Sequence, residues 1–252
     1  MKRYRLLDSL RGLALINMIF YHALWDLVYM FGINIPWYRS ASGHVWQQAI
    51  CCTFILISGF CQPFGRKKYA HGFKVLVCSA IITCTTLIFM PDSPVLFGVL
   101  TLLGSSMILV SALDGILRRI NPVCGIPVSF LLFVFTKNID MGYIGFGKFM
   151  VTLPQTLYSN MFTAYLGFPP QTFVSSDYFA LLPWIFLFLM GYFLNGLFKK
   201  YNLMKFLQEP GIPVLEFSGR HSLIIYMLHQ PVIYAVLYLI FRCFIPLPPY
   251  NL

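Results

Sequence analysis

The sequence predicts an all-α integral membrane protein, a polytopic helical bundle, and two observations indicate this fold class. Of the 252 residues, 58% are hydrophobic and only 10% are charged, with a mean hydropathy of +0.74. A water-soluble domain of this length cannot bury that much apolar surface in its core. Several apolar runs also approach the roughly 20 residues that an α-helix needs to cross the hydrocarbon core of a bilayer.

About seven transmembrane helices are expected from these runs, within a single domain over residues 1–252. Their ranges are 10–31, 46–63, 73–90, 95–113, 122–136, 178–198 and 221–245. The first run follows the basic start MKRYRLLDSLRG, which is typical of the beginning of a signal peptide. That run is too long for a signal peptide and no small-residue cleavage site follows it, so we expect it to remain as the first spanning helix.

The basic residues predict the orientation of the helices. If the N-terminus is cytoplasmic, 14 of the 18 Lys and Arg residues, beginning with Lys2 and Arg3, lie on the cytoplasmic side. The four on the outer side are Arg39, Lys137, Lys148 and Arg242. Cytoplasmic loops carry such an excess of Lys and Arg, which predicts a cytoplasmic N-terminus and an outer C-terminus at Leu252. The net charge of +10 is therefore attributed to membrane topology and not to nucleic-acid binding.

Residues 137–177 form the one long connection, and it is rich in Gly, Pro and aromatic residues (MGYIGFGKF, YLGFPPQTF). One more span here would place Lys199 and Lys200 on the outer side, against the charge pattern. We therefore expect an outer-face cap that lies on the bundle or dips into it. Irregular backbone is tolerated at membrane depth only where protein or water covers it. An ordinary interfacial loop is the alternative.

The first spanning run contains INMIFYHALWDL, which brings two ionisable residues into a hydrophobic segment. Arg11 and His22 are eleven residues apart, nearly three helical turns, and Asp26 lies one turn further on, so the three share one face. We call these three residues the polar stripe. Burying such groups costs several kcal/mol unless they are paired or line a cavity. The stripe therefore indicates a functional site, with Asp26 supporting His22 as a general base, or else a buried polar pair that joins helices.

The last run begins with GRHSLIIYMLHQP, in which Tyr226 and His229 share a face. Pro231 breaks the local hydrogen-bond ladder and frees a backbone carbonyl near His229. His229 is therefore either a second catalytic residue or a hydrogen-bond partner of that carbonyl. Near the sixth span, Asp177 or a serine before it is expected to cap the helix N-terminus.

The cytoplasmic cations form the candidate site for a polyanionic cofactor. They are Arg11, Arg66, Lys67, Lys68 and Arg220. Membrane topology explains most of them equally well. Arg11 differs because it begins the polar stripe, although Asp8 lies three residues before it and could pair with it. No cluster of residues has the spacing of metal ligands, so no metal site is expected.

Five segments of the sequence together resemble a known family. They are RLLDSLRGLALINMIFYHALWDL, FILISGF, FGVLTLLGSSMIL, LGFPPQTFVSSDYFALLPWIFLFLMGYFL and SGRHSLIIYMLHQPV, in this order. The sequence resembles bacterial membrane proteins grouped with the catalytic domain of heparan-alpha-glucosaminide N-acetyltransferase, within a superfamily of transmembrane acyltransferases. The resemblance implies a multi-pass protein of the bacterial inner membrane.

The resemblance implies an enzyme that transfers an acetyl group from cytoplasmic acetyl-CoA, a co-substrate, to an amino or hydroxyl group of a sugar or glycan reached from the other side. Arg11 to His22 spans about 16 Å along a helix, comparable to an extended pantetheine arm. A CoA head held by the cytoplasmic cations would then bring its thioester near His22. Partners expected on this reading are acyl-CoA, a sugar or glycan acceptor and the lipid bilayer, and the sequence leaves room for a homo-oligomer.

Two departures from the family pattern affect the assignment of the base. The family often has FGILH where this sequence has FGVLT, so Thr101 stands in place of a histidine. In the lysosomal branch the catalytic histidine lies in the loop after the first helix, and an asparagine stands at the position of His22. The loop lengths do not align, so that role is not carried over to His44, which is a weaker candidate at the outer end of the second span. His22 is preferred because it lies on the polar stripe. The alternative function is a proton-coupled transporter or flippase-like protein, which a midplane His and Asp would also suit. Against it, the sequence shows no repeated halves.

The topology is testable with reporter fusions. Fusions after Lys68, Asp140, Lys200 and Leu252 should report cytoplasm, outside, cytoplasm and outside, because this arrangement leaves 14 of 18 basic residues inside. A cytoplasmic signal at Asp140 would contradict the seven-span arrangement.

Overall fold

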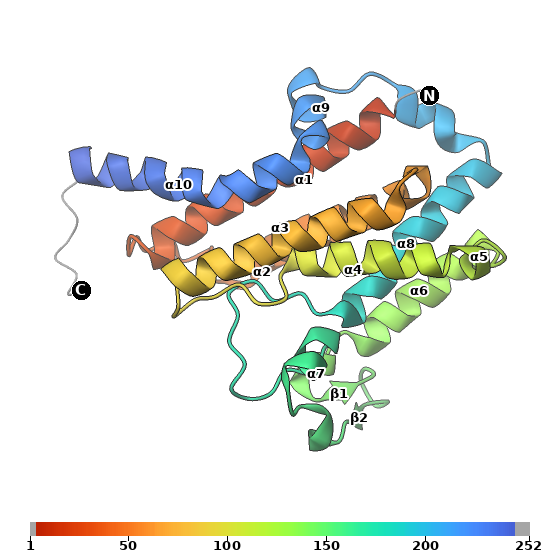
Figure 1. Ribbon diagram of the computed structural model, residues 1–252, viewed down its shortest axis with the longest axis horizontal. Coiled ribbons are helices and arrows are strands. Elements are labelled where there is room, and N and C mark those ends of the chain that lie inside the picture. The colour runs from red at the N-terminus through yellow and green to blue at the C-terminus, as the bar shows by residue number, and fades with distance from the viewer. Residues whose placement is uncertain (1–3, 245–252) are drawn as a thin grey trace. The chain divides into compact units, whose positions relative to one another are not determined.

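The computed structural model describes residues 4–244, and these residues are mostly helical (Figure 1). Lys2, Arg3 and Leu252, which the topology prediction uses, lie outside the described residues. The helices are α1 (Arg5–Tyr29), α2 (Ala41–Cys61), α3 (Lys68–Phe89), α4 (Val99–Ala112), α5 (Asp114–Leu117), α6 (Pro122–Thr136), α7 (Met161–Leu166), α8 (Leu181–Lys200), α9 (Pro213–Arg220) and α10 (Ser222–Phe244). Short 3-10 helices cover Gln62–Phe64, Ile139–Met141, Gln155–Leu157 and Leu203–Gln208, and the strands are β1 (Tyr143–Ile144) and β2 (Val151–Thr152). The prediction of an all-α membrane fold is confirmed.

Among the described residues, six helices are long and apolar enough to cross a bilayer. They are α1, α2, α3, α8, α10, and α6 together with the 3-10 turn that follows it. The seventh expected span, 95–113, is represented by α4, an apolar helix of 14 residues. At 1.5 Å per residue α4 is about 21 Å long, shorter than a hydrocarbon core of about 30 Å. The count of seven spans and the orientation therefore stay predictions.

The segment before α4 explains why that helix is short. Pro91 and Pro94 cannot donate backbone hydrogen bonds, and residues 91–98 are not helical. This segment instead pairs with the chain just before α8, because Phe179 N–H donates to Phe97 O at 2.9 Å. Helix α8 itself begins at Leu181 with Ala180 as its N-cap, so the expectation that Asp177 or a preceding serine caps it is wrong.

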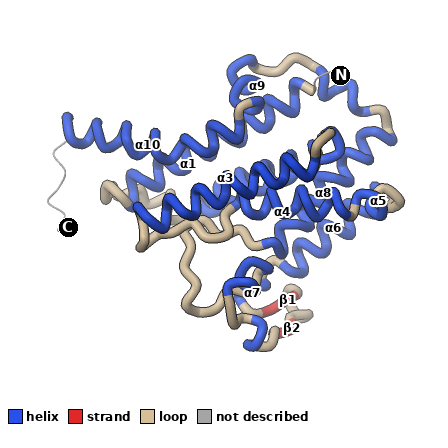
Figure 2. The backbone as a smooth tube through the Cα atoms, viewed as in Figure 1, coloured by secondary structure: helices blue, strands red, loops and turns tan. Residues whose placement is uncertain are grey.

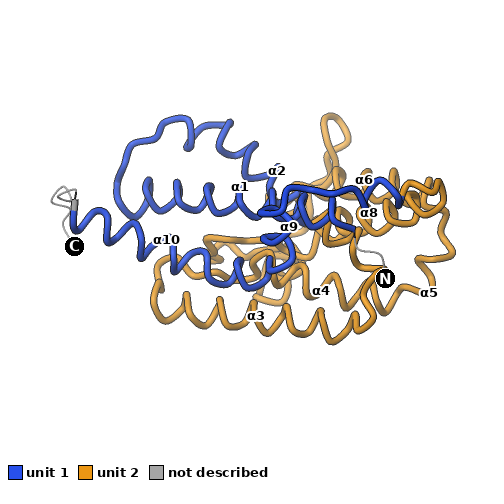
Figure 3. Tube along the Cα trace, turned by 90° about the horizontal axis from the view of Figure 1, so that it is seen from above, with its two compact units in different colours: residues 1–54, 204–252 blue, residues 55–203 orange. Residues whose placement is uncertain are grey.

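The described chain forms two compact units, drawn in different colours in Figure 3. Unit 1 takes its residues from 1–54 and 204–252, and unit 2 is 55–203. One boundary falls inside α2 and the other inside the 3-10 helix Leu203–Gln208. Whether the two units act as the single domain that the sequence predicts stays a prediction.

In unit 1, helix α9 packs against the first half of α1 through glycine. A Cβ at Gly12 would lie 2.0 Å from the carbonyl oxygen of Leu215, and one at Gly219 would lie 1.8 Å from that of Asp8. The two backbones can approach this closely only because both positions lack a side chain. Arg5 then donates to both oxygens of Glu216 at 3.0 and 3.1 Å, and this hydrogen bond lowers the pKa of the Glu216 carboxyl.

In unit 2, α3 packs along α4 and α6 packs along α8 (Figures 1 and 2). Buried amides connect the end of the α2 segment to both pairs. Asn195 donates to the carbonyl of Phe60 at 2.8 Å, and Gln62 donates to the carbonyl of Met107 at 2.9 Å. The amide nitrogens of both side chains thus find backbone carbonyls, as buried donors require, whereas Asn195 Oδ1 has no partner among the described residues.

Residues 137–177, all of which the structure describes, contain only short elements. The two-residue strands β1 and β2 pair antiparallel, next to the short helix α7 (Figure 2). Two tyrosine hydroxyls fasten the segment internally: Tyr158 donates to Ile139 O at 2.5 Å and Tyr178 to Ala164 O at 2.6 Å. We call residues 137–178 the cap. Its position on the outer face stays a prediction.

The contact between α1 and α9 makes a prediction about stability. Gly12→Ala should lower the free energy of unfolding by about 1–3 kcal/mol, because the added Cβ forces two backbones apart. The matched control is Gly115→Ala in α5, where a Cβ would meet nothing within 4 Å; it should be neutral or stabilising by about 0.5–1 kcal/mol. Denaturant titration in detergent micelles measures both. Equal effects of the two substitutions would contradict the close contact.

Candidate active site

Helices α1 and α10 bring together two histidines that are far apart in the sequence. The ring centroids of His22 and His229 are 4.8 Å apart, with the ring planes inclined at 65°. The Tyr226 ring lies 5.2 Å from that of His229, so the predicted shared face of Tyr226 and His229 is confirmed. His22 is half-buried. The sequence predicts both histidines as catalytic residues but does not predict the contact between their rings.

The hydrogen bond of His229 fixes which of its ring nitrogens carries the proton. Nδ1 lies 2.5 Å from the carbonyl oxygen of Tyr226. A carbonyl only accepts, so in the neutral imidazole Nδ1 carries the hydrogen and Nε2 keeps its lone pair. Nε2 is buried and has no partner among the described residues. Pro231 has no backbone N–H, so the carbonyl that loses its helical donor is that of Met227, four residues earlier. One alternative from the sequence is that His229 binds this freed carbonyl, whereas His229 binds the carbonyl of Tyr226.

Asp26 is completely buried and is bonded to α10. Its Oδ1 accepts from Nε2 of Gln230 at 2.6 Å. Asp26 Oδ2 and Gln230 Oε1 are buried without a partner among the described residues. The hydrogen bond of Asp26 therefore runs to Gln230, whereas the sequence analysis expected Asp26 to support the His22 ring. Buried polar atoms almost always find a partner, so Asp26 Oδ2 and Gln230 Oε1 remain available for a further hydrogen bond.

Gln230 is the residue of this site that sequence reasoning missed. It lies directly after His229 in the motif LHQP, and it is 204 residues from Asp26. The available signal was the presence of a second polar residue beside a histidine in an otherwise apolar helix. A buried carboxylate needs a partner, and an amide on a facing helix is a suitable one.

Two of the predicted cofactor-binding cations lie near the contact of α1 with α9. Arg11 is 3.8 Å from Asp8, with 21% of its side chain exposed, so the pairing foreseen from the spacing is confirmed. Arg220 is exposed, and its Nε donates to the backbone carbonyl of Glu216 at 3.2 Å. Both guanidinium groups keep further N–H groups, because each has five.

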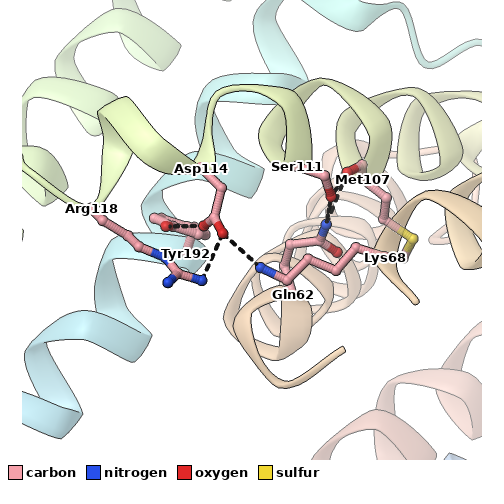
Figure 4. Close-up of polar contacts among 7 residues, drawn as sticks. All are labelled: Gln62, Lys68, Met107, Ser111, Asp114, Arg118 and Tyr192. Atoms are coloured by element: carbon pink, nitrogen blue, oxygen red, sulfur yellow. Dashed lines mark hydrogen bonds and ion pairs between the residues drawn. The ribbon is translucent and has the colours of Figure 1, made fainter. Parts of the chain in front are cut away.

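The other three predicted cations, Arg66, Lys67 and Lys68, belong to unit 2. Arg66 and Lys67 are exposed, whereas the Lys68 ammonium lies 2.9 Å from Asp114 and its side chain is 14% exposed. The Asp114 carboxylate also accepts hydrogen bonds from Arg118 at 2.7 Å and from Tyr192 at 2.6 Å (Figure 4). The charge of Lys68 is therefore already balanced within the protein.

Burial alone would raise the pKa of Asp114. The hydrogen bonds from Tyr192, Lys68 and Arg118 outweigh burial and lower that pKa to about 2. The carboxylate is therefore ionised at every physiological pH and holds the α3, α5 and α8 side chains together (Figure 4).

His44 and Thr101, the two other positions considered for the general base, make different contacts. His44 is exposed in the first turn of α2, and its backbone N–H donates to Ser40. Thr101, where the family often has a histidine, shares a hydrogen bond of 2.6 Å with Ser79. Thr101 therefore helps to join α3 to α4.

Within the part of the chain that the structure describes, six helices are long and apolar enough to span a membrane, and a histidine pair lies between two of them. These features define a class of protein, the polytopic membrane proteins with an ionisable site among their helices. Such a site can accept and return a proton where water is scarce.

The sequence matches the family described as heparan-alpha-glucosaminide N-acetyltransferase, catalytic, over residues 3–231. The chain belongs to this family, as the resemblance implied, and the match covers His22, Asp26, His229 and Gln230. The family indicates a membrane acyltransferase. No curated protein and no solved structure gives a significant match.

The Asp114 cluster makes a prediction about pH. The folded-state pKa of about 2 lies below the ordinary value of about 3.9, so the ionised carboxylate stabilises the folded protein. That contribution is complete above about pH 4 and is lost as the pH falls towards 2. Asp114→Asn should therefore lower the free energy of unfolding at neutral pH and flatten its decline between pH 4 and 2.

Denaturant titrations in micelles at a series of pH values measure this. Asp92→Asn, the same substitution at an exposed aspartate, is the matched control and should keep the wild-type slope. A wild-type slope in Asp114→Asn would show that the cluster does not stabilise the fold.

Proposed function

We propose that this protein transfers an acetyl group from acetyl-CoA to an amino or hydroxyl group of a sugar or glycan acceptor. The observation that carries the proposal is the His22–His229 pair, in which the lone pair of His229 Nε2 is buried and unused among the described residues. Membership of the acetyltransferase family supports the same reaction. We also propose a bacterial inner membrane as its location, with the donor on the cytoplasmic side.

In the proposed reaction, the imidazole pair removes a proton from the acceptor nitrogen or oxygen as that atom attacks the thioester carbonyl. The new C–N or C–O bond forms, the C–S bond breaks, and the CoA thiolate takes the proton from the imidazolium. Of the two rings, His229 is the better-defined base, since its hydrogen bond to Tyr226 O leaves Nε2 as the acceptor. His22 lies against it and shares the site.

Asp26 acts through Gln230 in this proposal. Its hydrogen bond fixes the residue that follows His229, and so limits the rotation of α10 about its axis at the site. Asp26 is therefore a positioning residue, and Asp26→Asn should reduce the rate less than loss of either ring.

The donor is held by cations in our proposal. Arg11 lies eleven residues before His22 on α1, a rise of about 16 Å, and pairs with Asp8 at a distance long enough to permit exchange for a phosphate. Exposed Arg220 supplies further positive charge. Arg66 and Lys67, which belong to unit 2, stay candidates from the sequence alone. Lys68 contributes less, because Asp114 already neutralises it.

Replacement of the histidines tests the proposal. His22→Ala and His229→Ala should each lower the rate of acetyl transfer by roughly 10²–10⁴-fold, the usual contribution of general acid–base catalysis. Transfer of labelled acetyl from acetyl-CoA to a panel of amino sugars and glycan precursors, by protein purified in nanodiscs, is the measurement.

The matched control is His221→Ala, an exposed histidine at the end of α9 whose Nδ1 contacts Phe217 O. It should keep the wild-type rate. Full activity in both His22→Ala and His229→Ala would show that neither histidine is the general base, and His44 would become the next candidate. Absence of any transfer or acetyl-CoA hydrolysis in the wild-type protein would favour the transporter.

A further inference from the structure

Four exposed basic residues gather at one end of unit 2, and the proposed reaction uses none of them. Two follow α5 in the connection to α6, and two are the last residues of α8. We call these four residues the basic patch: Arg118, Arg119, Lys199 and Lys200. Helices α6 and α8 are both candidate membrane spans. The basic patch is therefore expected where the hydrocarbon core meets the lipid headgroups.

Contacts within unit 2 bring the two halves of the basic patch together. Lys200 Nζ donates to Oδ1 of Asn121, the N-cap residue of α6, at 3.4 Å and across 79 residues of sequence. Lys199 Nζ lies 5.5 Å from the centroid of the Phe64 ring, and the positive charge of Arg118 acts on it. The end of α8 and the start of α6 therefore present their cations to the same region.

The acidic residues beside the basic patch are too few to neutralise it. Asp114 is the one acidic residue in the segments 113–121 and 197–203, and its carboxylate already accepts three hydrogen bonds (Figure 4). Arg118 donates to Asp114, yet its side chain stays 66% exposed. The other three members form no ion pair with a carboxylate among the described residues. Like charges repel one another, so an anion that binds among them lowers the energy of the basic patch.

Apolar side chains beside the basic patch indicate the kind of anion. Ile116 and Ile120 belong to the same α5–α6 region and are both exposed. Tyr201 directly follows Lys200, is exposed, and has its ring centroid 5.8 Å from Lys200 Nζ. Tyrosine is enriched at the level of the lipid headgroups. A phosphate that carries acyl chains contacts both the cations and these apolar side chains, whereas inorganic phosphate contacts the cations alone.

We propose that the basic patch binds the phosphate headgroup of an anionic phospholipid in the leaflet at this end of unit 2. Clusters of Lys and Arg next to spanning helices attract such lipids. Membrane topology accounts for basic residues in each connection, but it does not require that two connections place them together. A bound headgroup would hold the end of α8 to the start of α6. The inference does not depend on acetyl transfer.

Lipid binding by the full chain tests this inference. The protein in detergent micelles is titrated with phosphatidylglycerol or with zwitterionic phosphatidylcholine, and bound lipids are counted by native mass spectrometry. The wild type should bind phosphatidylglycerol more tightly. Arg119→Gln/Lys200→Gln should weaken phosphatidylglycerol binding about 30-fold, because each Lys or Arg near an anionic lipid contributes roughly fivefold in affinity. Arg119→Lys/Lys200→Arg keeps both charges and should bind as the wild type does.

The matched control is Lys137→Gln/Lys148→Gln, which removes two exposed cations of unit 2 outside the basic patch. Lys137 lies at the opposite end of α6, and this variant should keep the wild-type affinity. Equal weakening in the two glutamine variants, or no preference of the wild type for phosphatidylglycerol, would overturn the inference.

A parallel titration with free CoA separates a lipid site from a donor site. Arg119→Gln/Lys200→Gln should bind CoA as the wild type does. Loss of CoA affinity together with wild-type phosphatidylglycerol affinity would assign the basic patch to the donor and overturn the inference.

Discussion

The hydrogen bond between Gln230 and Asp26 is the contact on which the candidate active site depends. A carboxylate inside a spanning helix costs several kcal/mol unless it has a partner, so this contact determines which face of α10 turns towards α1. His229 directly precedes Gln230, and His22 lies one turn before Asp26 on α1. Once Gln230 faces Asp26, the two histidine rings therefore come into contact. The histidine pair is thus a geometric consequence of satisfying one buried acid.

The few acidic residues of this basic protein are used mainly inside it. Asp8 pairs with Arg11, Glu216 with Arg5, and Asp114 with two cations at once. The sequence has only 8 acidic residues against 18 basic ones, so its carboxylates are too few to neutralise all of its cations. Pairing within the fold therefore balances the charges of Arg5, Arg11, Lys68 and Arg118 first.

Much of the fold could be predicted because hydrophobic length determines the helices of a membrane protein, and the polar stripe followed from helical periodicity alone. The contacts across helices could not be predicted in this way. Gln230 meets Asp26 over 204 residues, and the start of α4 depends on backbone bonds with the segment before α8. Periodicity describes one helix at a time, whereas these features depend on which helices face each other.

Two hydrogen bonds between the cap and the segment before α4 have a consequence for local motion. The Ser175 hydroxyl accepts from Leu96 N–H at 3.0 Å and donates to Leu96 O at 2.9 Å, and Phe179 N–H adds a third bond to Phe97. Local opening of the protein proceeds in cooperative units whose hydrogen bonds break together. The segment just before α4 and the chain from Ser175 to Phe179 are therefore expected to open together. Amide hydrogens at Leu96 and Phe179 should exchange with solvent at linked rates, and a ligand that slows one should slow the other.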